Sequence, residues 1–156
     1  MEKINWLKKE YNNLIISELY NIMTLRQVVF VVEQNCPYLD ADGRDQYSHH
    51  LMGYPQPGLL VAYTRIVNPG IVYQEASIGR VIIAQNYRNI GLGIVLMEES
   101  MKYAAELYGD VPIRISAQVY LKKFYTKFGF EQVSDSYLED GIPHIEMLVP
   151  SLANFV

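Results

Sequence analysis

The 156-residue chain contains a single cysteine, Cys36, and therefore cannot form an internal disulfide bond. Such sparing use of cysteine is typical of a reducing compartment, so we expect a cytoplasmic protein. No apolar run approaches the roughly 20 residues that a membrane-spanning helix needs. The N-terminus Met-Glu-Lys-Ile-Asn-Trp does not have the pattern of a signal peptide. The sequence therefore predicts no membrane partner.

The chain also lacks an excess of basic residues. It has 13 Lys and Arg against 17 Asp and Glu, a formal net charge of −4. Sequence-independent nucleic-acid binding depends on clustered Lys and Arg, so no nucleic-acid partner is expected. Half of the residues are hydrophobic and 19% are charged, which is typical of a globular protein. The length fits one domain that spans residues 1–156.

Metal-binding patterns are missing as well. An EF-hand loop that began at Asp40 would need glycine at its sixth position and glutamate at its twelfth, where the chain has Asp45 and Leu51. We expect a solvated turn whose aspartates cap backbone N–H groups. His49 and His50 are adjacent on a predicted strand and point to opposite faces, so they do not readily chelate one ion. No metal is expected.

Hydrophobic periodicity predicts an α+β fold. A helix from about residue 17 has apolar residues at spacings of three and four that continue through Val28–Glu33, although the β-branched residues there also fit a strand. Strands are expected at residues 4–10, 49–54, 59–67, 76–84, 113–117, 130–133 and 145–149, with a long helix ending near residue 108 and a short one at residues 120–128. Short turns favour an antiparallel meander of the early strands, and the long helix implies a parallel crossover.

The stretch Arg88-Asn-Ile-Gly-Leu-Gly93 follows the fourth predicted strand and opens the long helix. Gly91 and Gly93 lack Cβ atoms, so a phosphate can approach free backbone N–H groups where the helix dipole favours negative charge. No Gly-Lys-Ser/Thr follows, as a Walker P-loop requires, and Leu96 stands where a dinucleotide fingerprint has its third glycine. Taken alone, the pattern fits an ordinary strand–helix turn equally well.

Two motifs in this order make the chain resemble the GNAT superfamily of N-acyltransferases. Arg88–Gly93 matches the family's Arg/Gln-x-x-Gly-x-Gly/Ala pyrophosphate loop, and Tyr125 with Gly129-Phe130 matches its Tyr-x-x-x-Gly-Phe element. The ElaA-like branch is the nearer resemblance, through three segments: residues 25–38, 78–81 and 139–147. The resemblance implies a mixed, mainly antiparallel twisted sheet of six to seven strands with about four helices, splayed between the fourth and fifth strands. It leaves the substrate open.

The same resemblance implies a site for acetyl-CoA as co-substrate. The pantetheine amides would pair with backbone groups of Val81, Ile82 and Ile83. The pyrophosphate would bind backbone N–H groups of Arg88, Asn89, Ile90, Gly91, Leu92 and Gly93. Gln118 occupies a position where many members have a cofactor-contacting Asn, so it keeps the amide on a longer side chain.

Acetyl transfer to a primary amine needs groups that remove and donate protons. Tyr125 is expected to donate to the departing thiolate, since a phenol is neutral at physiological pH; packing on the short helix is the alternative. Glu33 and His144 are the candidate bases. Glu33 could equally lie at the margin of the buried helix face, and His144 could be an inert strand residue. The resemblance implies that a backbone N–H of the fourth strand stabilises the oxyanion.

The C-terminal residues 128–156 contain no Lys or Arg. Their acidic residues are Glu131, Asp135, Glu139, Asp140 and Glu146. An acidic rim would attract a cationic small-molecule or peptide amine, although a solvated acidic surface explains the pattern equally well. We therefore predict an acetyl-CoA-dependent N-acetyltransferase that works by direct attack in a ternary complex, with a non-catalytic acyl-CoA-binding module as the alternative. A homodimer is plausible because edge strands often need cover.

Overall fold

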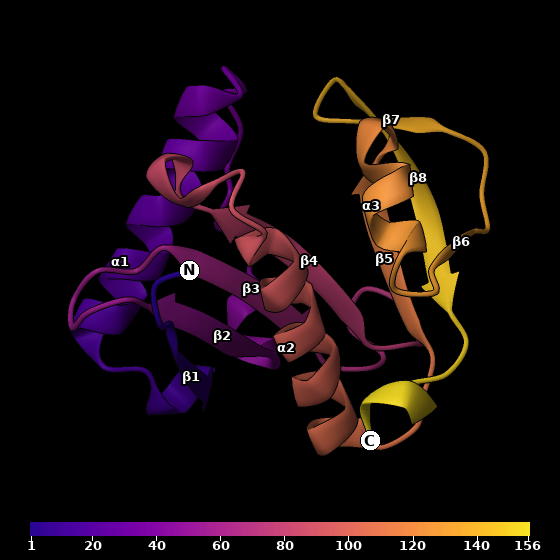
Figure 1. Ribbon diagram of the computed structural model, residues 1–156. Coiled ribbons are helices and arrows are strands. Elements are labelled where there is room, and N and C mark those ends of the chain that lie inside the picture. The colour runs from indigo at the N-terminus through magenta and orange to yellow at the C-terminus, as the bar shows by residue number, and fades with distance from the viewer.

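The computed structural model describes all 156 residues and contains eight strands and three α-helices (Figure 1). Four strands form an antiparallel sheet in the order β1-β2-β3-β4, in which the second to fourth make the predicted meander. They are β1 (Asn5–Glu10), β2 (Ser48–Tyr54), β3 (Ala62–Val67) and β4 (Ser77–Ile83). The other four are β8 (Ile142–Val149) and the three strands that pair with it, β5 (Ile113–Gln118), β6 (Glu131–Gln132) and β7 (Tyr137–Glu139). The predicted mixed, mainly antiparallel architecture is confirmed, with one strand more and one α-helix fewer than expected.

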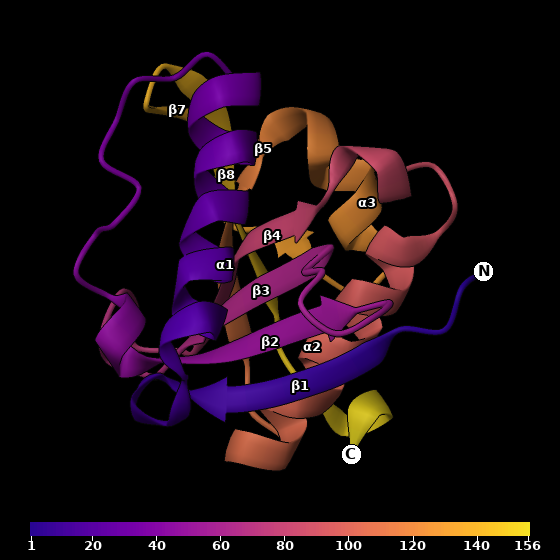
Figure 2. The same cartoon turned by 90° about the vertical axis from the view of Figure 1, so that its left-hand side faces the viewer.

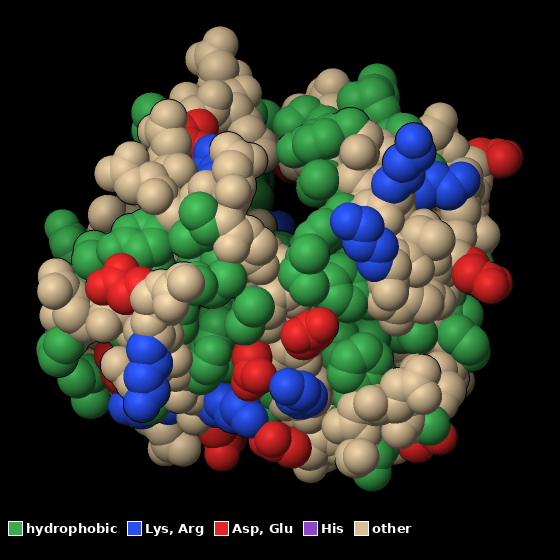
Figure 3. All heavy atoms as spheres, viewed as in Figure 1, with side chains coloured by type: hydrophobic (Ala, Val, Ile, Leu, Met, Phe, Trp, Pro, Cys, Tyr) green, Lys and Arg blue, Asp and Glu red, His purple; other side chains and the backbone are tan.

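The two sheets are joined by a single parallel bridge between Ala76 and Ile113. The Arg114 N–H donates to the Ala76 carbonyl there, at 3.1 Å. Beyond this bridge β4 and β5 diverge (Figure 1), and the gap appears as a hollow on the molecular surface (Figure 3). The splay predicted between the fourth and fifth strands is therefore confirmed.

Helices cover both faces of the first sheet (Figure 2). Helix α1 (Ile16–Arg26) crosses one face and continues as a π-helical segment, Gln27–Glu33. The run Val28–Glu33 is thus helical, as preferred, but with a wider turn than an α-helix. Helix α2 (Leu92–Tyr108) lies on the other face, and the short α3 (Lys122–Thr126) follows β5. None of these helices has the length and apolar character that a bilayer span requires.

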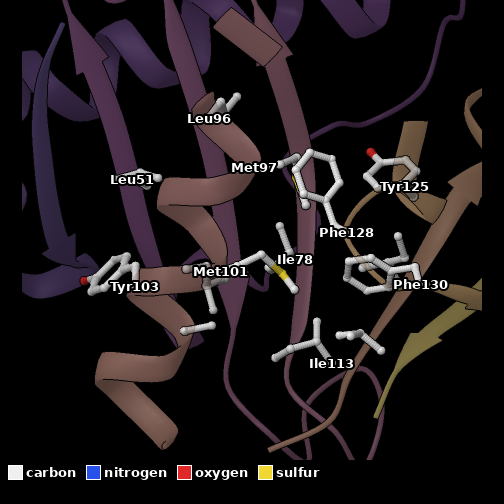
Figure 4. Packing of buried hydrophobic residues seen from close by; sticks show 14 of the residues in the cluster. Leu51, Ile78, Leu96, Met97, Met101, Tyr103, Ile113, Tyr125, Phe128 and Phe130 are labelled. Carbon is white, nitrogen blue, oxygen red and sulfur yellow. The ribbon is translucent and has the colours of Figure 1, made fainter. Parts of the chain in front are cut away.

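The main hydrophobic core holds the diverging sheets together. Met97 and Met101 of α2 and Ile78 of β4 meet Phe128 and Phe130 of the second half in this cluster (Figure 4). A smaller cluster beneath α1 includes Ile22, Val29, Met52, Leu60, Tyr63 and Ile82. Packing on α2 therefore replaces the backbone hydrogen bonds that β4 and β5 do not make.

The segment Asp40–Asp45 is not the solvated turn predicted from the sequence. Asp40 and Asp45 are buried and bind the fully buried Arg26, at 2.7 Å to its Nε and 2.5 Å to its Nη1. Asp42 binds both terminal nitrogens of Arg65, at 2.8 Å each. One aspartate does cap a backbone N–H, since Asp42 accepts from Arg44. The prediction was wrong because the arginine partners lie 14 to 23 residues away in the chain, beyond what a local pattern records.

Candidate active site

A cavity of about 780 Å³ occupies the space between β4 and the β5–β8 sheet (Figure 3). It brings together most of the predicted site residues: Glu33, Val81, Ile82, Ile83, Arg88, Gln118, Tyr125 and His144. The other five, Asn89, Ile90, Gly91, Leu92 and Gly93, are not part of its lining and follow Arg88 along the chain. One site therefore collects residues from six segments that are distant in sequence.

A β-bulge interrupts β4 where it enters the cavity. Arg65 pairs with Gly79 and Tyr63 pairs with Ile82, so β4 has one residue more than β3 between the two pairs. Arg80 lies in this bulge with φ +50°, in the left-handed region. A bulge of this kind bends its strand and re-aims the backbone groups next to it.

After the bulge, β4 presents a free backbone edge to the cavity. The Ala84 N–H donates to Val61 on the β3 side, at 2.8 Å, whereas the Ile83 carbonyl accepts from Arg88 Nε on the other side, at 2.8 Å. Because successive residues of a strand direct their backbone groups to opposite sides, Val81 and Ile83 face the cavity and Ile82 faces β3. The backbone of Ile82 is thus less suited to a ligand than those of Val81 and Ile83, a distinction the sequence did not reveal.

The turn before α2 forms a row of free backbone donors. Asn89 (φ +63°) and Gly91 (φ +83°) are both left-handed, and Gly91 is the N-cap of α2. The N–H groups of the five residues from Asn89 to Gly93 donate to no group of the chain, whereas the Arg88 N–H donates to the Gln85 carbonyl. Consecutive free N–H groups in such a turn attract anions, and the dipole of α2 adds to the effect.

Glu33 ends the π-helical segment, is exposed and lines the cavity, so a position facing the cavity and one at the margin of the buried helix face both agree with the structure. Its Oε2 lies 2.7 Å from Nη2 of Arg88. Arg88 thus binds Glu33 and the Ile83 carbonyl at once, and its guanidinium does not face the free donors of the following turn. The ion pair occupies one oxygen of the carboxylate.

Tyr125, on α3, packs its ring in the core and directs its hydroxyl toward β4 (Figure 4). Phe124 and Phe130 contact the ring edge-on, at centroid distances of 5.1 and 6.1 Å. Burial raises the pKa of the Tyr125 phenol far above its usual value, and the nearby Tyr120 adds to the shift. The ring therefore packs as an ordinary core residue does, while the phenol stays neutral and able to donate at the cavity surface.

His144, on β8, is nearly buried and stacks on Tyr137. Its Nδ1 lies 2.7 Å from the Ile142 carbonyl, and its Nε2 lies 3.2 Å from the Glu139 carboxylate. A carbonyl oxygen only accepts, so Nδ1 carries a hydrogen. Nε2 is the nitrogen that can take up or release a proton, with a carboxylate beside it.

The charged lining of the cavity has both signs. Glu139 and Asp140 of the predicted acidic rim line it, but Glu131, Asp135 and Glu146 do not. The lining also includes Arg44, Arg65 and Arg80. Of the five acidic residues in the C-terminal segment, only Glu139 and Asp140 reach the cavity, so an acidic rim that attracts a cationic amine stays a prediction for these two alone.

Sequence reasoning missed two features of the site. One is Arg80 with the aspartates that bind it. Residues 78–81 carry part of the family resemblance, but nothing in their sequence indicates that Arg80 forms an ion pair. The other is a polar wall with Tyr73 and Ser116 in the cavity lining, where the Ser116 hydroxyl lies 2.5 Å from the hydroxyl of Tyr137, which stands behind the lining. The chain has 13 tyrosines, so residue type alone does not distinguish Tyr73 and Tyr137 from the other eleven.

Comparisons with known proteins agree with this geometry. The profile described as the acetyltransferase (GNAT) domain matches residues 42–150. ElaA of Escherichia coli is 40% identical over 146 residues, which cover 92% of this chain and 95% of ElaA. The crystal structure of Escherichia coli ElaA superposes with a TM-score of 0.87 at 39% identity, covering 94% of this chain and 99% of that one.

An acyl-CoA N-acyltransferase from Pseudomonas aeruginosa superposes with a TM-score of 0.89 at 42% identity, covering 94% of this chain and 99% of that one. A GNAT family acetyltransferase from Elizabethkingia anophelis, solved with acetyl-CoA bound, shares the fold with a TM-score of 0.67 at 12% identity, covering 96% of this chain and 99% of that one. The chain therefore belongs to the GNAT family of acyl-CoA N-acyltransferases, in the branch that contains ElaA.

Proposed function

We propose that the protein transfers an acetyl group from acetyl-CoA to a primary amine by direct attack in a ternary complex. One observation carries the proposal: the free edge of β4 at Val81 and Ile83 leads along the chain to the free donors of residues 89–93, and Tyr125 faces the same cavity. The first two features suit an extended amide chain that ends in a pyrophosphate, and the third suits a leaving thiolate.

The cofactor would bind as an additional strand beside β4, with its pyrophosphate on the N–H groups of residues 89–93. A pantetheine amide would then compete with Arg88 Nε for the Ile83 carbonyl, so Arg88 would release this carbonyl when the cofactor binds. Gly93 supports this arrangement. A Cβ added there would meet Phe124 at 3.8 Å, an ordinary contact, so packing within the chain does not explain the glycine. Gln118 lines the cavity and offers a further amide.

In the reaction, the neutral amine would attack the thioester carbonyl carbon. The Val81 N–H would hold the oxyanion that develops on the carbonyl oxygen. The tetrahedral intermediate would then collapse, breaking the carbon–sulfur bond and releasing the thiolate, to which Tyr125 would donate its proton. The attacking nitrogen would lose its remaining surplus proton to solvent, and the Tyr125 phenol would be restored from solvent. The raised pKa of the Tyr125 phenol keeps that proton in place before the transfer.

An alkylamine has a pKa near about 10 and arrives protonated, so a base is needed. We place His144 ahead of Glu33 in this role. The Ile142 carbonyl holds the hydrogen on Nδ1, which leaves Nε2 as the proton acceptor, and Glu139 would stabilise the imidazolium that results. Glu33 is less suited because Arg88 already binds its carboxylate.

The proposal treats residues 1–156 as one catalytic unit in the cytoplasm that acts on a small-molecule or peptide amine. Its support is that Glu33, which precedes the region matched by the family profile, lines the same cavity as His144 near the end of the chain. Whether two copies associate is a separate proposal, which sedimentation would test.

The test is an assay of acetyl-CoA against a library of amines, peptides and aminoglycosides that monitors free thiol. We expect acetyl-CoA to raise the melting temperature and at least one amine to release CoA. Binding without thiol release from any acceptor would instead support the acyl-CoA-binding module. In the Tyr125→Phe variant, kcat should fall about 100-fold through loss of the acid.

The matched control for this variant is Tyr20→Phe, on the exposed side of α1. It should leave kcat unchanged. Equal kcat for Tyr125→Phe and the wild type at every pH would contradict the acid role.

A further inference from the structure

Arg80 adopts a backbone conformation that residues other than Gly, Asn and Asp rarely take. Its φ of +50° places it in the left-handed region, at the bulge of β4. Such a conformation is disfavoured by contacts of the Cβ with the backbone, so surrounding interactions must hold it. The residue that follows, Val81, presents its N–H to the cavity. The strained position is therefore next to the backbone group assigned to the oxyanion.

The side chain of Arg80 leaves the bulge and binds Asp40. Its Nε lies 2.8 Å from Asp40 Oδ1, and its Nη2 lies 3.3 Å from the Asp40 carbonyl. The guanidinium also lies over the ring of Phe30, 5.7 Å from the centroid. Arg80 thus contacts the carboxylate and the backbone carbonyl of Asp40, and the Phe30 ring of the π-helical segment. Together these contacts pair its charge and fix the direction of its side chain.

Asp40 is itself held from the opposite side. Arg26 donates from Nε to Oδ2 of Asp40, at 2.7 Å, and from Nη2 to its carbonyl, at 2.9 Å. Arg26 is 0% exposed and Asp40 is 3% exposed. A continuous set of charge-assisted hydrogen bonds therefore runs from α1 through Asp40 to the bulge of β4.

We propose that Arg80 is a positioning residue for the acyl transfer: its ion pair with Asp40 holds the β4 bulge so that the Val81 N–H points at the thioester carbonyl. Arg80 acts through the backbone and does not bind either substrate. The inference rests on the proposed function, because it assigns a cause to the geometry of the proposed oxyanion donor.

The kinetic test compares Arg80→Gly with the wild type. Glycine tolerates the positive φ, so this variant can keep the bulge while it loses the anchor. We expect kcat to fall by about 10- to 100-fold, because an oxyanion donor out of place stabilises the transition state poorly. The KM values for acetyl-CoA and for the amine should change by less than about threefold, since ground-state binding is retained. Arg80→Lys should recover part of kcat.

The matched control is Arg114→Ala on β5. It removes a partly exposed ion pair with Glu75, and neither residue lines the cavity. It should leave both constants unchanged. Unchanged kcat in Arg80→Gly would overturn the proposal. So would a rise in the KM for the amine at wild-type kcat, because that result would show direct binding of the acceptor.

A second measurement does not depend on turnover. Acetyl-CoA should shift the Val81 amide resonance of the wild type further than CoA does, because both place the pantetheine arm beside β4 but only acetyl-CoA has a thioester carbonyl. This additional shift should be lost in Arg80→Gly and kept in Arg114→Ala; its retention in Arg80→Gly would overturn the proposal. A wild type that releases no thiol with any amine contradicts the proposed function, and the amide shift still decides whether Arg80 positions the backbone.

Discussion

The two walls of the cavity are built in different ways. Behind β4 lies a network of three arginines and three aspartates, most of them deeply buried: Arg26, Arg65, Arg80, Asp40, Asp42 and Asp45. The opposite wall, formed by β5, β7 and β8, has the carboxylates of Glu139 and Asp140 in its lining but no arginine. Neutral contacts support it, such as the Ser116–Tyr137 hydrogen bond and the stack of Tyr137 on His144. Two of the three residues of β7 are exposed.

This difference matches what each wall would do. Charge-assisted hydrogen bonds with forked geometry define position closely, and a backbone donor that stabilises charge must be fixed before the reaction. A wall whose lining has no arginine–carboxylate pairs and that ends in an exposed strand rearranges at lower cost. We infer that the β4 wall is the rigid side, which holds the cofactor, and that the β8 wall is the adaptable side, which receives the acceptor.

The largest change should come from breaking the charged wall. In Arg26→Ala, Asp40 and Asp45 lose a buried partner, which should lower the free energy of unfolding by about 3–5 kcal/mol and the melting temperature by about 10 °C. Urea unfolding measures the first quantity. Lys8→Ala removes an exposed pair with Glu106 and should cost less than about 1 kcal/mol. Similar losses in the two variants would show that the network is not rigid.

The next effect separates the candidate bases on the two sides. His144→Ala should lower kcat about 100-fold at neutral pH, because the acceptor of the amine proton is removed. Glu33→Gln should change kcat by only about threefold, because its carboxylate is bound by Arg88. The measurement is kcat for both variants with one amine. A larger loss in Glu33→Gln would move the base to the α1 side, and unchanged rates in both would remove both assignments.

The smallest expected effect is on the stability of the protein at acid pH. Burial alone would raise the pKa of Asp42, but hydrogen bonds from Arg65 hold it well below the ordinary 3.8. A depressed pKa contributes stability above the ordinary value, and this stability is lost as the pH falls toward the folded-state pKa. At pH 7 the Asp42→Asn variant should be about 1–2 kcal/mol less stable than the wild type, and the difference should shrink below about pH 4. Urea unfolding at several pH values would show it. A difference that is constant with pH would mean that Asp42 acts by shape alone.

The sequence predicted what depends on local pattern. The meander, the crossover helix and the free donors before α2 all follow from periodicity, glycines and turn lengths. The resemblance carried by Tyr125 and Gly129-Phe130 implied a phenol at the site, and Tyr125 does line the cavity. These features involve residues that are close in the chain, so a single sequence records them.

The features that the sequence did not predict depend on ion pairs between residues that are distant in the chain. Arg80 and Asp40 are 40 residues apart, and no periodicity relates them. The aspartates of residues 40–45 looked like surface residues because their burial depends on arginines of α1, β3 and β4. The bulge at Arg80 was hidden for the same reason: a left-handed arginine has no local signature, and only its partners make the conformation stable.

The single bridge between β4 and β5 has a thermodynamic consequence. A sheet that leaves one strand position vacant would be completed by the pantetheine chain, and a ligand that binds only the folded state adds RT ln(1 + [L]/Kd) to its stability. At a cofactor concentration of 100 times Kd, this linkage amounts to about 2.7 kcal/mol. Under the proposed function, the lifetime of the folded protein in the cell would therefore follow the supply of its own acyl donor.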